Sequence, residues 1–307
     1  MEKTKKDRIF IFVVTMRIYN TKDFLKTVLS LHKTDTLKLL FPTMLLVGLY
    51  SYGIAYLEIE YLDLTSKSTV TNVGLVHSML GFVLSLLLVF RTNTAYDRWW
   101  EGRKLWGKLV NDTRNFAIKI NAIIPKEEQH HKDQIAKYLR YFPLFLAKHL
   151  SKESTRLALD EEFSKLEEGL KHHAPIELAS ILMQKIKQLN REGIITDVDY
   201  LFLENQLSGF LELTGGCERI KNTPIPYSYS SFIKKFILLF VLALPVAYVI
   251  NIGYFMVPLT MFIYYVLMSL EIIAEEIEDP FNNDVNDVPM ETLAQNIGKN
   301  VDLIFKK

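Results

Sequence analysis

Four long apolar stretches limit what this chain can fold into more than any other feature. They cover residues 37–57, 72–90, 236–252 and 254–270. About 20 helical residues cross a hydrocarbon core of roughly 30 Å, a length that the first two stretches reach and the last two approach. No Lys or Arg lies in their interiors, which disfavours the alternative of buried helices in a large soluble protein. We therefore predict an all-α membrane protein with four transmembrane helices.

The overall composition excludes some other classes of protein. The 307 residues include 36 Lys and Arg against 35 Asp and Glu, so the basic excess of a nucleic-acid-binding protein is missing. Cys217 is the single cysteine. An internal disulfide is therefore excluded, and a zinc site would have to rely on His and carboxylate side chains.

The distribution of positive charge orients the predicted spans. Lys and Arg are frequent in residues 1–36 and 91–235, whereas the two outer connections contain one basic residue, Lys67. Positive charge stays on the cytoplasmic side, so we expect both termini and the middle of the chain to be cytoplasmic. The predicted parts are a cytoplasmic N-terminal segment (1–36), a transmembrane hairpin (37–90), a cytoplasmic helical domain (91–231), a second transmembrane hairpin (232–274) and a cytoplasmic C-terminal segment (275–307).

The middle of the chain has the pattern of a helical bundle. Apolar residues recur at spacings of three and four in 132–150, 155–173 and 175–193, as on one face of a helix. Pro143 should disturb the first of these helices locally. We expect a further helix from residue 194 that ends at Gly215 and Gly216.

One face of the second apolar stretch changes from large to small side chains. Residues four apart share a helix face, and here that face carries Phe90, Leu86, Phe82, Ser78 and Gly74. Around an axis, such helices would form a wide outer mouth and a narrow apolar neck, and apolar constrictions can gate ions by dewetting. Ordinary helix packing is the alternative interpretation.

A dense polar and aromatic belt follows this stretch without a helix break. Anchoring at the membrane interface accounts for Arg91 and the tryptophans, but not for acidic residues at similar depth. The belt therefore predicts structural ion pairs, to which we assign Asp97, Arg98 and Glu101. We expect a further ion pair between Glu218 and Arg219.

The sequence gives little support to an enzyme. A glycine-rich phosphate loop, a His-Glu-x-x-His motif and a nucleophile elbow are all missing from it. The adjacent histidines at 130–131 and 172–173 point to different sides of a helix, which favours solvated positions over a metal site. We expect Cys217 to be a packed thiol, His77 to be a packing residue, and no cofactor to be bound.

Three motifs resemble the bestrophin family of channels. "RTNTAYDRWWEGRKLWG" resembles the family signature after the second span, "GGCERIKNTPIPYSY" the bacterial motif before the third span, and "EEIEDPFNNDVNDVP" the motif after the fourth. They occur in the family's order around four spans. The resemblance implies a homopentamer around a central pore, with Phe82, Leu86 and Phe90 as its neck and Gly74 and Ser78 on its outer face.

The resemblance also implies a second constriction at the cytoplasmic exit. The matching position is Asp199, where relatives usually have an aliphatic residue. A ring of carboxylates there would concentrate cations. A register shifted by one or two residues would instead turn Val198 or Leu201 inward, and the sequence leaves this choice open.

The third motif matches the calcium clasp of eukaryotic relatives in diluted form. The matching carboxylates are Asp279, Asp284 and Asp287, but Val285 interrupts the acidic run. Calcium needs about six to eight oxygen ligands, which makes calcium binding doubtful. The favoured alternative is that Asp279 to Phe281 redirect the chain, with Pro280 ending the helix.

Together these features predict a bestrophin-like homopentameric channel in the bacterial inner membrane, whose partners are other copies of itself, lipid and inorganic ions. Asp199 and the acidic outer residues Glu58, Glu60 and Asp63 favour monovalent cations such as Na⁺ and K⁺. Chloride conduction is the alternative, followed by a non-conducting membrane scaffold.

Overall fold

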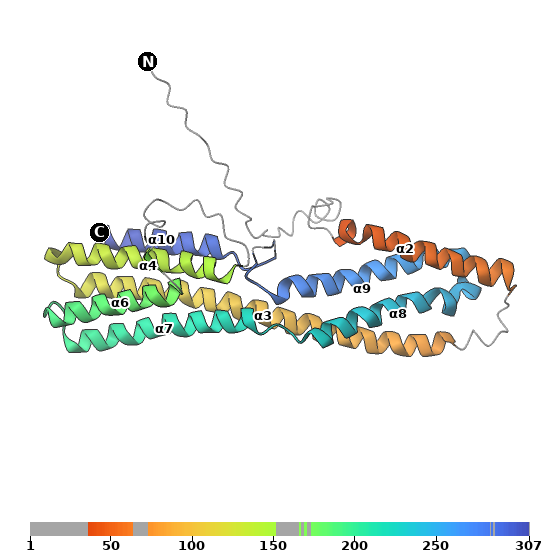
Figure 1. The fold of residues 1–307 in the computed structure, drawn as a ribbon, viewed down its shortest axis with the longest axis horizontal. Coiled ribbons are helices and arrows are strands. Elements are labelled where there is room, and N and C mark those ends of the chain that lie inside the picture. The colour runs from red at the N-terminus through yellow and green to blue at the C-terminus, as the bar shows by residue number, and fades with distance from the viewer. Residues whose placement is uncertain are drawn as a thin grey trace, which may run out of the picture. The chain divides into compact units, whose positions relative to one another are not determined.

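The computed structural model describes residues 36–63, 73–151, 166, 169–170, 173–282, 284 and 286–306. Within these ranges all regular secondary structure is helical, which confirms the predicted all-α class. The chain divides into two compact units (Figure 1). We call the described residues of 36–99 and 224–279 the apolar unit, and the described residues of 100–223 and 280–306 the polar unit.

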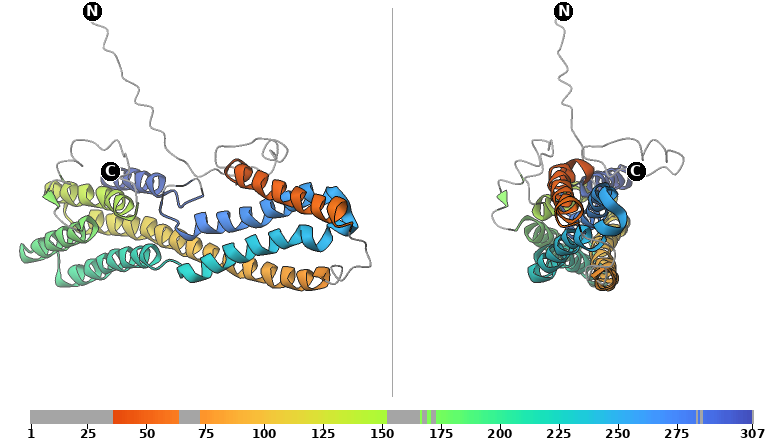
Figure 2. Two further views of the ribbon diagram at one scale, coloured as in Figure 1. Left: turned by 45° about the vertical axis from the view of Figure 1, so that its right-hand side comes forward. Right: turned by 90° about the vertical axis from the view of Figure 1, so that its right-hand side faces the viewer.

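The apolar unit is built from long helices that run side by side (Figures 1 and 2). They are α2 (Thr36–Tyr56), which continues into a π-helical turn (Leu57–Tyr61), the first part of α3 (Val73–Ile123), α8 (Tyr227–Ile252) and α9 (Met256–Glu278). Their shared core includes Leu84 and Leu88 of α3 and Ile237 of α8. Close packing of these apolar side chains holds the unit together.

In the described part of the chain, three helical runs are long and apolar enough to cross a membrane, by length and composition: Thr36–Tyr61, Gly74–Ile123 and Tyr227–Glu278. The last run contains two helices, α8 and α9, which a 3₁₀ turn (Gly253–Phe255) joins. Gly253 has a φ angle of 68° there, a conformation that glycine adopts without strain. This turn lets α9 pack back against α8.

The third apolar stretch is part of a longer helix than the sequence predicted. α8 begins at Tyr227 rather than near residue 236. The segment from Tyr227 to Lys235 is also helical, but its polar residues hide this in the apolar pattern. Residues 223–226 form a short non-helical connection before it. Pro226 directly precedes the helix, where its missing N–H costs no helical hydrogen bond.

The polar unit is a bundle of amphipathic helices. It contains the second part of α3, α4 (Gln129–Leu150), which follows a short 3₁₀ turn (Lys126–Glu128), α6 (Ala174–Arg191), α7 (Asp197–Asn222) and α10 (Met290–Phe305). α4 packs against α6, α7 and α10, and α6 packs against α7. The ring of Phe210 contacts Phe116 and Phe142, with centroids 5.9 and 5.3 Å away. All three rings are fully buried, as the helical spacing of apolar residues leads one to expect.

The helix end expected at Gly215 and Gly216 does not occur, because α7 continues through both residues to Asn222. α4 contains Pro143 within one continuous helix, and its neighbours Tyr141, Phe142 and Phe145 are buried, so tertiary packing outweighs the hydrogen bond that proline cannot make. The predicted helix at 155–173 lies mostly outside the described residues.

The two glycines of α7 differ in their surroundings. A Cβ atom at Gly216 would lie 3.1 Å from the side chain of Leu105, whereas one at Gly215 would meet nothing within 4 Å. Gly216 therefore allows α3 and α7 to approach closely, which is a packing role and not a helix end.

This difference predicts opposite effects of one substitution at adjacent positions. Gly216→Leu should lower the free energy of unfolding by about 1–3 kcal/mol because it overpacks the contact with Leu105. Gly215→Leu should raise it by up to about 0.8 kcal/mol through helix propensity. Thermal unfolding of the purified variants measures both effects, and equal shifts would contradict this account of Gly216.

Candidate functional site

The predicted neck residues lie on the exposed face of α3. The exposed fractions are 72% for Phe82, 46% for Leu86 and 55% for Phe90, whereas Leu84 and Leu88 are buried in the core of the apolar unit. Helical residues are about 100° apart, so residues two positions apart point to nearly opposite sides. Phe82, Leu86 and Phe90 are each two positions from Leu84 or Leu88, and they therefore point away from the core. Large apolar side chains in such positions suit contact with lipid, with another copy of the chain or with a pore.

The outer end of the same stripe has turned toward α8. The hydroxyl of Tyr248 donates a hydrogen bond to the Gly74 carbonyl at 3.0 Å and lies 3.1 Å from the Ser78 hydroxyl. A Cβ atom at Gly74 would lie 3.2 Å from the Tyr248 ring. Within the subunit, these small residues therefore make room for a tyrosine of α8, and they do not only face outward.

The geometry of a helix explains why the stripe changes face. A step of four residues turns a helix about 40° past a full turn. Over the four steps from Phe90 back to Gly74 the drift is about 160°. Leu75 and Met79, which are both exposed, continue the face of Leu86 more closely than Gly74 does.

His77 lies on the face of α3 that packs against α8. It is buried, its Nε2 lies 2.9 Å from the Phe240 carbonyl oxygen, and its ring stacks on Phe240 with centroids 4.0 Å apart. This environment is that of a packing residue with a satisfied polar atom.

Arg91 is the centre of a buried group of charges in the apolar unit. Its side chain is 1% exposed, its Nη2 lies 2.8 Å from Glu278 Oε2, and its Nε lies 3.5 Å from Glu271 Oε2. Both glutamates belong to α9. Glu278 also accepts the Ile225 N–H at 2.6 Å, and its backbone carbonyl accepts Arg98 Nε at 2.9 Å. The cluster thus links α3, α9 and the segment before α8.

The sequence predicted Arg91 as an anchor at the membrane interface, but its side chain is buried against Glu271 and Glu278 instead. Arg91 is buried because Glu271 and Glu278 compensate its charge. These glutamates are two helical turns apart and so share one face of α9. α9 ends with four glutamates, and the first of them, Glu271, directly follows the fourth apolar stretch. A carboxylate at that position was the signal that could have revealed a partner of Arg91.

The remaining charges of the belt have varied surroundings. Asp97 is exposed, and the described part of the chain gives it no ion pair. Glu101 pairs with Arg219 of α7 at the surface of the polar unit. Arg219 therefore does not pair with Glu218, because consecutive residues of one helix point about 100° apart.

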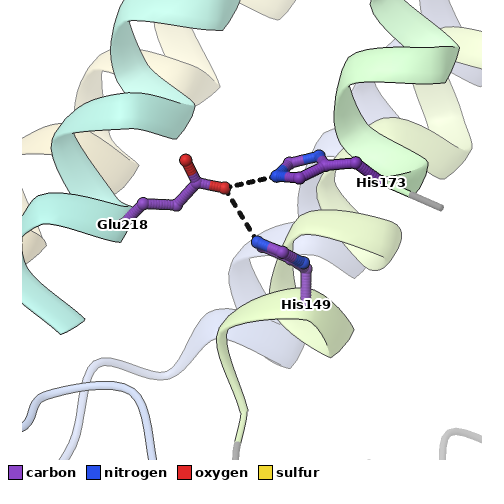
Figure 3. A group of neighbouring side chains, drawn as sticks. All are labelled: His149, His173 and Glu218. Atoms are coloured by element: carbon purple, nitrogen blue, oxygen red, sulfur yellow. Dashed lines mark hydrogen bonds and ion pairs between the residues drawn. The ribbon is translucent and has the colours of Figure 1, made fainter. Parts of the chain in front are cut away.

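Glu218 instead joins two histidines from other helices (Figure 3). Its Oε1 lies 2.8 Å from His149 Nε2 and 2.6 Å from His173 Nε2. His149 is near the end of α4, and His173 directly precedes α6. Burial and then the nearby His173 lower the pKa of His149, against the opposing effect of Glu218, so His149 is mainly neutral at pH 7.

Cys217 has the packed environment expected from the sequence. It is fully buried, and burial, with added effects of Glu218 and Glu101, raises the pKa of its thiol to about 12. The side chain is therefore a neutral thiol at pH 7 and a poor nucleophile.

Asp199 lies in the first turn of α7 and pairs with Thr196, the residue that caps this helix. Its Oδ2 accepts hydrogen bonds from the Thr196 hydroxyl at 2.6 Å and the Thr196 N–H at 3.1 Å, and its own N–H donates to Thr196 Oγ1 at 3.2 Å. This is a reciprocal capping box. The apolar neighbours Val198 and Leu201 are exposed.

The carboxylates of the third motif take part in a turn. Asp287 is buried, and its Oδ2 accepts the N–H of Asp284 at 2.8 Å. α9 ends at Glu278, before Asp279 and Pro280, and Phe281 is buried next to Gly102. Among the residues that the structure describes, which lack 283 and 285 here, ligand spacing for a metal occurs at His149, His173 and Glu218 and not at this acidic run.

A family profile described as "Bacterial/Fungal Bestrophin protein" matches residues 16–303. The chain belongs to the bacterial and fungal bestrophin family. This confirms the resemblance that its three motifs predicted.

Similar bestrophin-family proteins come from several bacteria. The chain is 35% identical over 232 residues to a Nostoc protein and 31% identical over 263 residues to one from Ralstonia nicotianae, both named "Voltage-dependent anion channel-forming protein". These matches cover 72% and 83% of this chain, and 74% and 83% of the relatives. A crystal structure of a variant bestrophin homologue from Klebsiella pneumoniae has a TM-score of 0.76 and 28% identity, covering 88% of this chain and all of that one.

The buried charge cluster predicts a strong dependence on Arg91. Arg91→Ala should lower the free energy of unfolding by about 3–5 kcal/mol, because it leaves two buried glutamates without a counter-charge. Lys234→Ala, which removes the exposed pair with Glu275, should cost at most about 1 kcal/mol. Thermal unfolding in detergent compares the two, and equally small losses would show that the Arg91 cluster is not a stabilising contact.

Proposed function

We propose that this chain is the subunit of a homopentameric bestrophin channel in which Phe82, Leu86 and Phe90 line the neck of the pore. The observation that carries the proposal is the exposure of these three apolar side chains on one face of α3, in a family with relatives named as channel-forming proteins. In a ring of subunits, a helix face directed away from its own core can meet the central axis.

The apolar unit supplies the proposed membrane part. Its four helices, with α8 and α9 as separate spans, would cross the bacterial inner membrane. The excess of Lys and Arg outside the apolar stretches supports cytoplasmic termini and a cytoplasmic polar unit. Subunit contacts and lipid would then cover the exposed apolar side chains of α2, α3 and α9.

An apolar neck acts on ions through water. A narrow pore section lined by Phe and Leu disfavours a continuous water column, so an ion must lose hydration to pass. The neck itself selects neither sign of charge, because it carries no fixed charge. Selectivity must therefore come from groups beyond it.

We propose small anions such as chloride as the conducted ions, although the sequence alone favoured cations. The names of the relatives support anions. The carboxylate of Asp199, the main argument for cations, already accepts two hydrogen bonds in a capping box. Glu58 of the outer acidic group is buried, and Glu60 accepts a hydrogen bond from Tyr254. Both findings weaken the case for acidic rings.

The sign of the charge is testable by the reversal potential. In a planar bilayer with a sodium chloride gradient, we expect the purified protein to reverse current near the chloride equilibrium potential. A reversal near the sodium potential would keep the channel and restore cations. A protein that forms the oligomer but passes no current at any voltage would favour the scaffold.

The neck is testable by truncation. Phe82→Ala, Leu86→Ala and Phe90→Ala should each raise single-channel conductance severalfold, because a wider section dewets less readily. Leu80→Ala is the matched control: Leu80 is also exposed on α3, but it lies about 160° around the helix from Phe82, and conductance should not change. Unchanged currents in all three neck variants would place the constriction elsewhere.

The role of Asp199 is testable separately. Thr196 is the N-cap of α7, so Thr196→Ala should cost about 0.5–2 kcal/mol of stability. If the Asp199 carboxylate serves mainly this capping box, Asp199→Asn should leave the reversal potential unchanged. A shift of the reversal potential toward chloride in Asp199→Asn would mean that this carboxylate does select ions.

A further inference from the structure

We infer that His149, His173 and Glu218 bind a divalent transition-metal ion, with Zn²⁺ as the ion that fits these ligands best. The site lies within the polar unit, so the inference does not rest on the proposed channel function. It also differs from the acidic run after α9, because none of the three residues belongs to that motif.

The three ligand atoms converge from separate elements. His149 comes from α4, His173 from the residue before α6, and Glu218 from α7 (Figure 3). Both Nε2 atoms lie within 2.8 Å of the same Glu218 oxygen, and all three ligand atoms lie within 4.8 Å of one another. Tetrahedral zinc with bonds of about 2.0–2.1 Å separates its ligand atoms by about 3.3 Å. The two distances between Nε2 and Glu218 Oε1 would have to lengthen by about 0.5–0.7 Å to reach this separation.

The chemistry of the ligands favours zinc over harder ions. Two imidazole nitrogens and one carboxylate oxygen match the protein ligands of an open zinc site, whose fourth ligand is water. Calcium and magnesium need about six or more ligands, mainly oxygen, and this group offers one carboxylate. The side chains of His149, His173 and Glu218 are 33%, 29% and 26% exposed, so an ion and its water can reach them.

Both imidazoles already point their Nε2 atoms at one carboxylate oxygen, and their ring centroids are 4.2 Å apart. The three side chains therefore converge on one point, and a divalent ion there would bond to each nitrogen and to the oxygen.

Metal binding has one identifiable cost in hydrogen bonding. The N–H of Ile176 donates to Nδ1 of His173 at 3.4 Å, which leaves the proton of a neutral ring on Nε2. Coordination through Nε2 would move that proton to Nδ1 and break this bond. The bond is long, and other orphan N–H groups at the start of α6 are solvent-accessible in an ordinary helix, so the cost is small.

The test uses the full-length protein in detergent, stripped with a chelator and titrated with Zn²⁺. Calorimetry should show one saturable zinc site per subunit, and Co²⁺ should give the visible absorption of a tetrahedral site. His173→Ala and Glu218→Gln should each weaken zinc binding by more than the roughly 10–100-fold that an outer-shell change costs. Zinc should also raise the melting temperature of the wild type but not of these variants.

His131→Ala is the matched control. His131 also lies on α4 near two carboxylates, 3.6 Å from Glu128 and 3.7 Å from Glu192. This group has one imidazole and two carboxylates, whereas the inferred site has two imidazoles and one carboxylate. The loss of His131 should leave zinc affinity unchanged. Circular dichroism checks that each variant is folded, and Glu218→Gln keeps the size of the side chain if His173→Ala is unstable. The inference is overturned if the wild type has no saturable site, or if neither ligand variant weakens it.

Discussion

The buried guanidinium of Arg91 is the interaction on which the apolar unit most depends. Apolar packing between α3 and α9 is non-directional and would tolerate some sliding or rotation. The buried charge of Arg91 does not tolerate such movement, because it must stay within reach of Glu278 and Glu271. Phe90 precedes Arg91 in the helix, so an inward Arg91 turns Phe90 outward. The same contact thus fixes both the packing of α3 and the direction of the proposed neck residues.

The polar unit uses charges in a different way. Its pairs are partly exposed and join helices that are far apart in sequence, as Glu101 with Arg219 and Glu218 with His149. Because α7 remains helical through Gly215 and Gly216, the neighbours Glu218 and Arg219 reach different partners. The continuity of this helix is therefore what brings the two histidines to one carboxylate and creates the inferred metal site.

The acidic residues show why local sequence is a weak guide to ion selectivity. A carboxylate attracts cations into a pore only if it faces the pore. Asp199 serves the start of α7, and Glu58 is buried within the subunit. Negative charge counted along the sequence therefore overstates the field that a permeating ion would meet, and the proposed anion selectivity follows from this and from the named relatives.

The sequence by itself determined the all-α class, the apolar helices, the uninterrupted α3 and the family, because apolar length, helical periodicity and long motifs are local properties. The tertiary structure decided the rest. Arg91 is buried because of partners in α9 such as Glu271, 180 residues away, and Gly74 turns toward Tyr248 because a four-residue repeat drifts around a helix. His149 and His173 meet only when α4, α6 and α7 pack together. Such contacts join distant residues, and no spacing within a single helix encodes them.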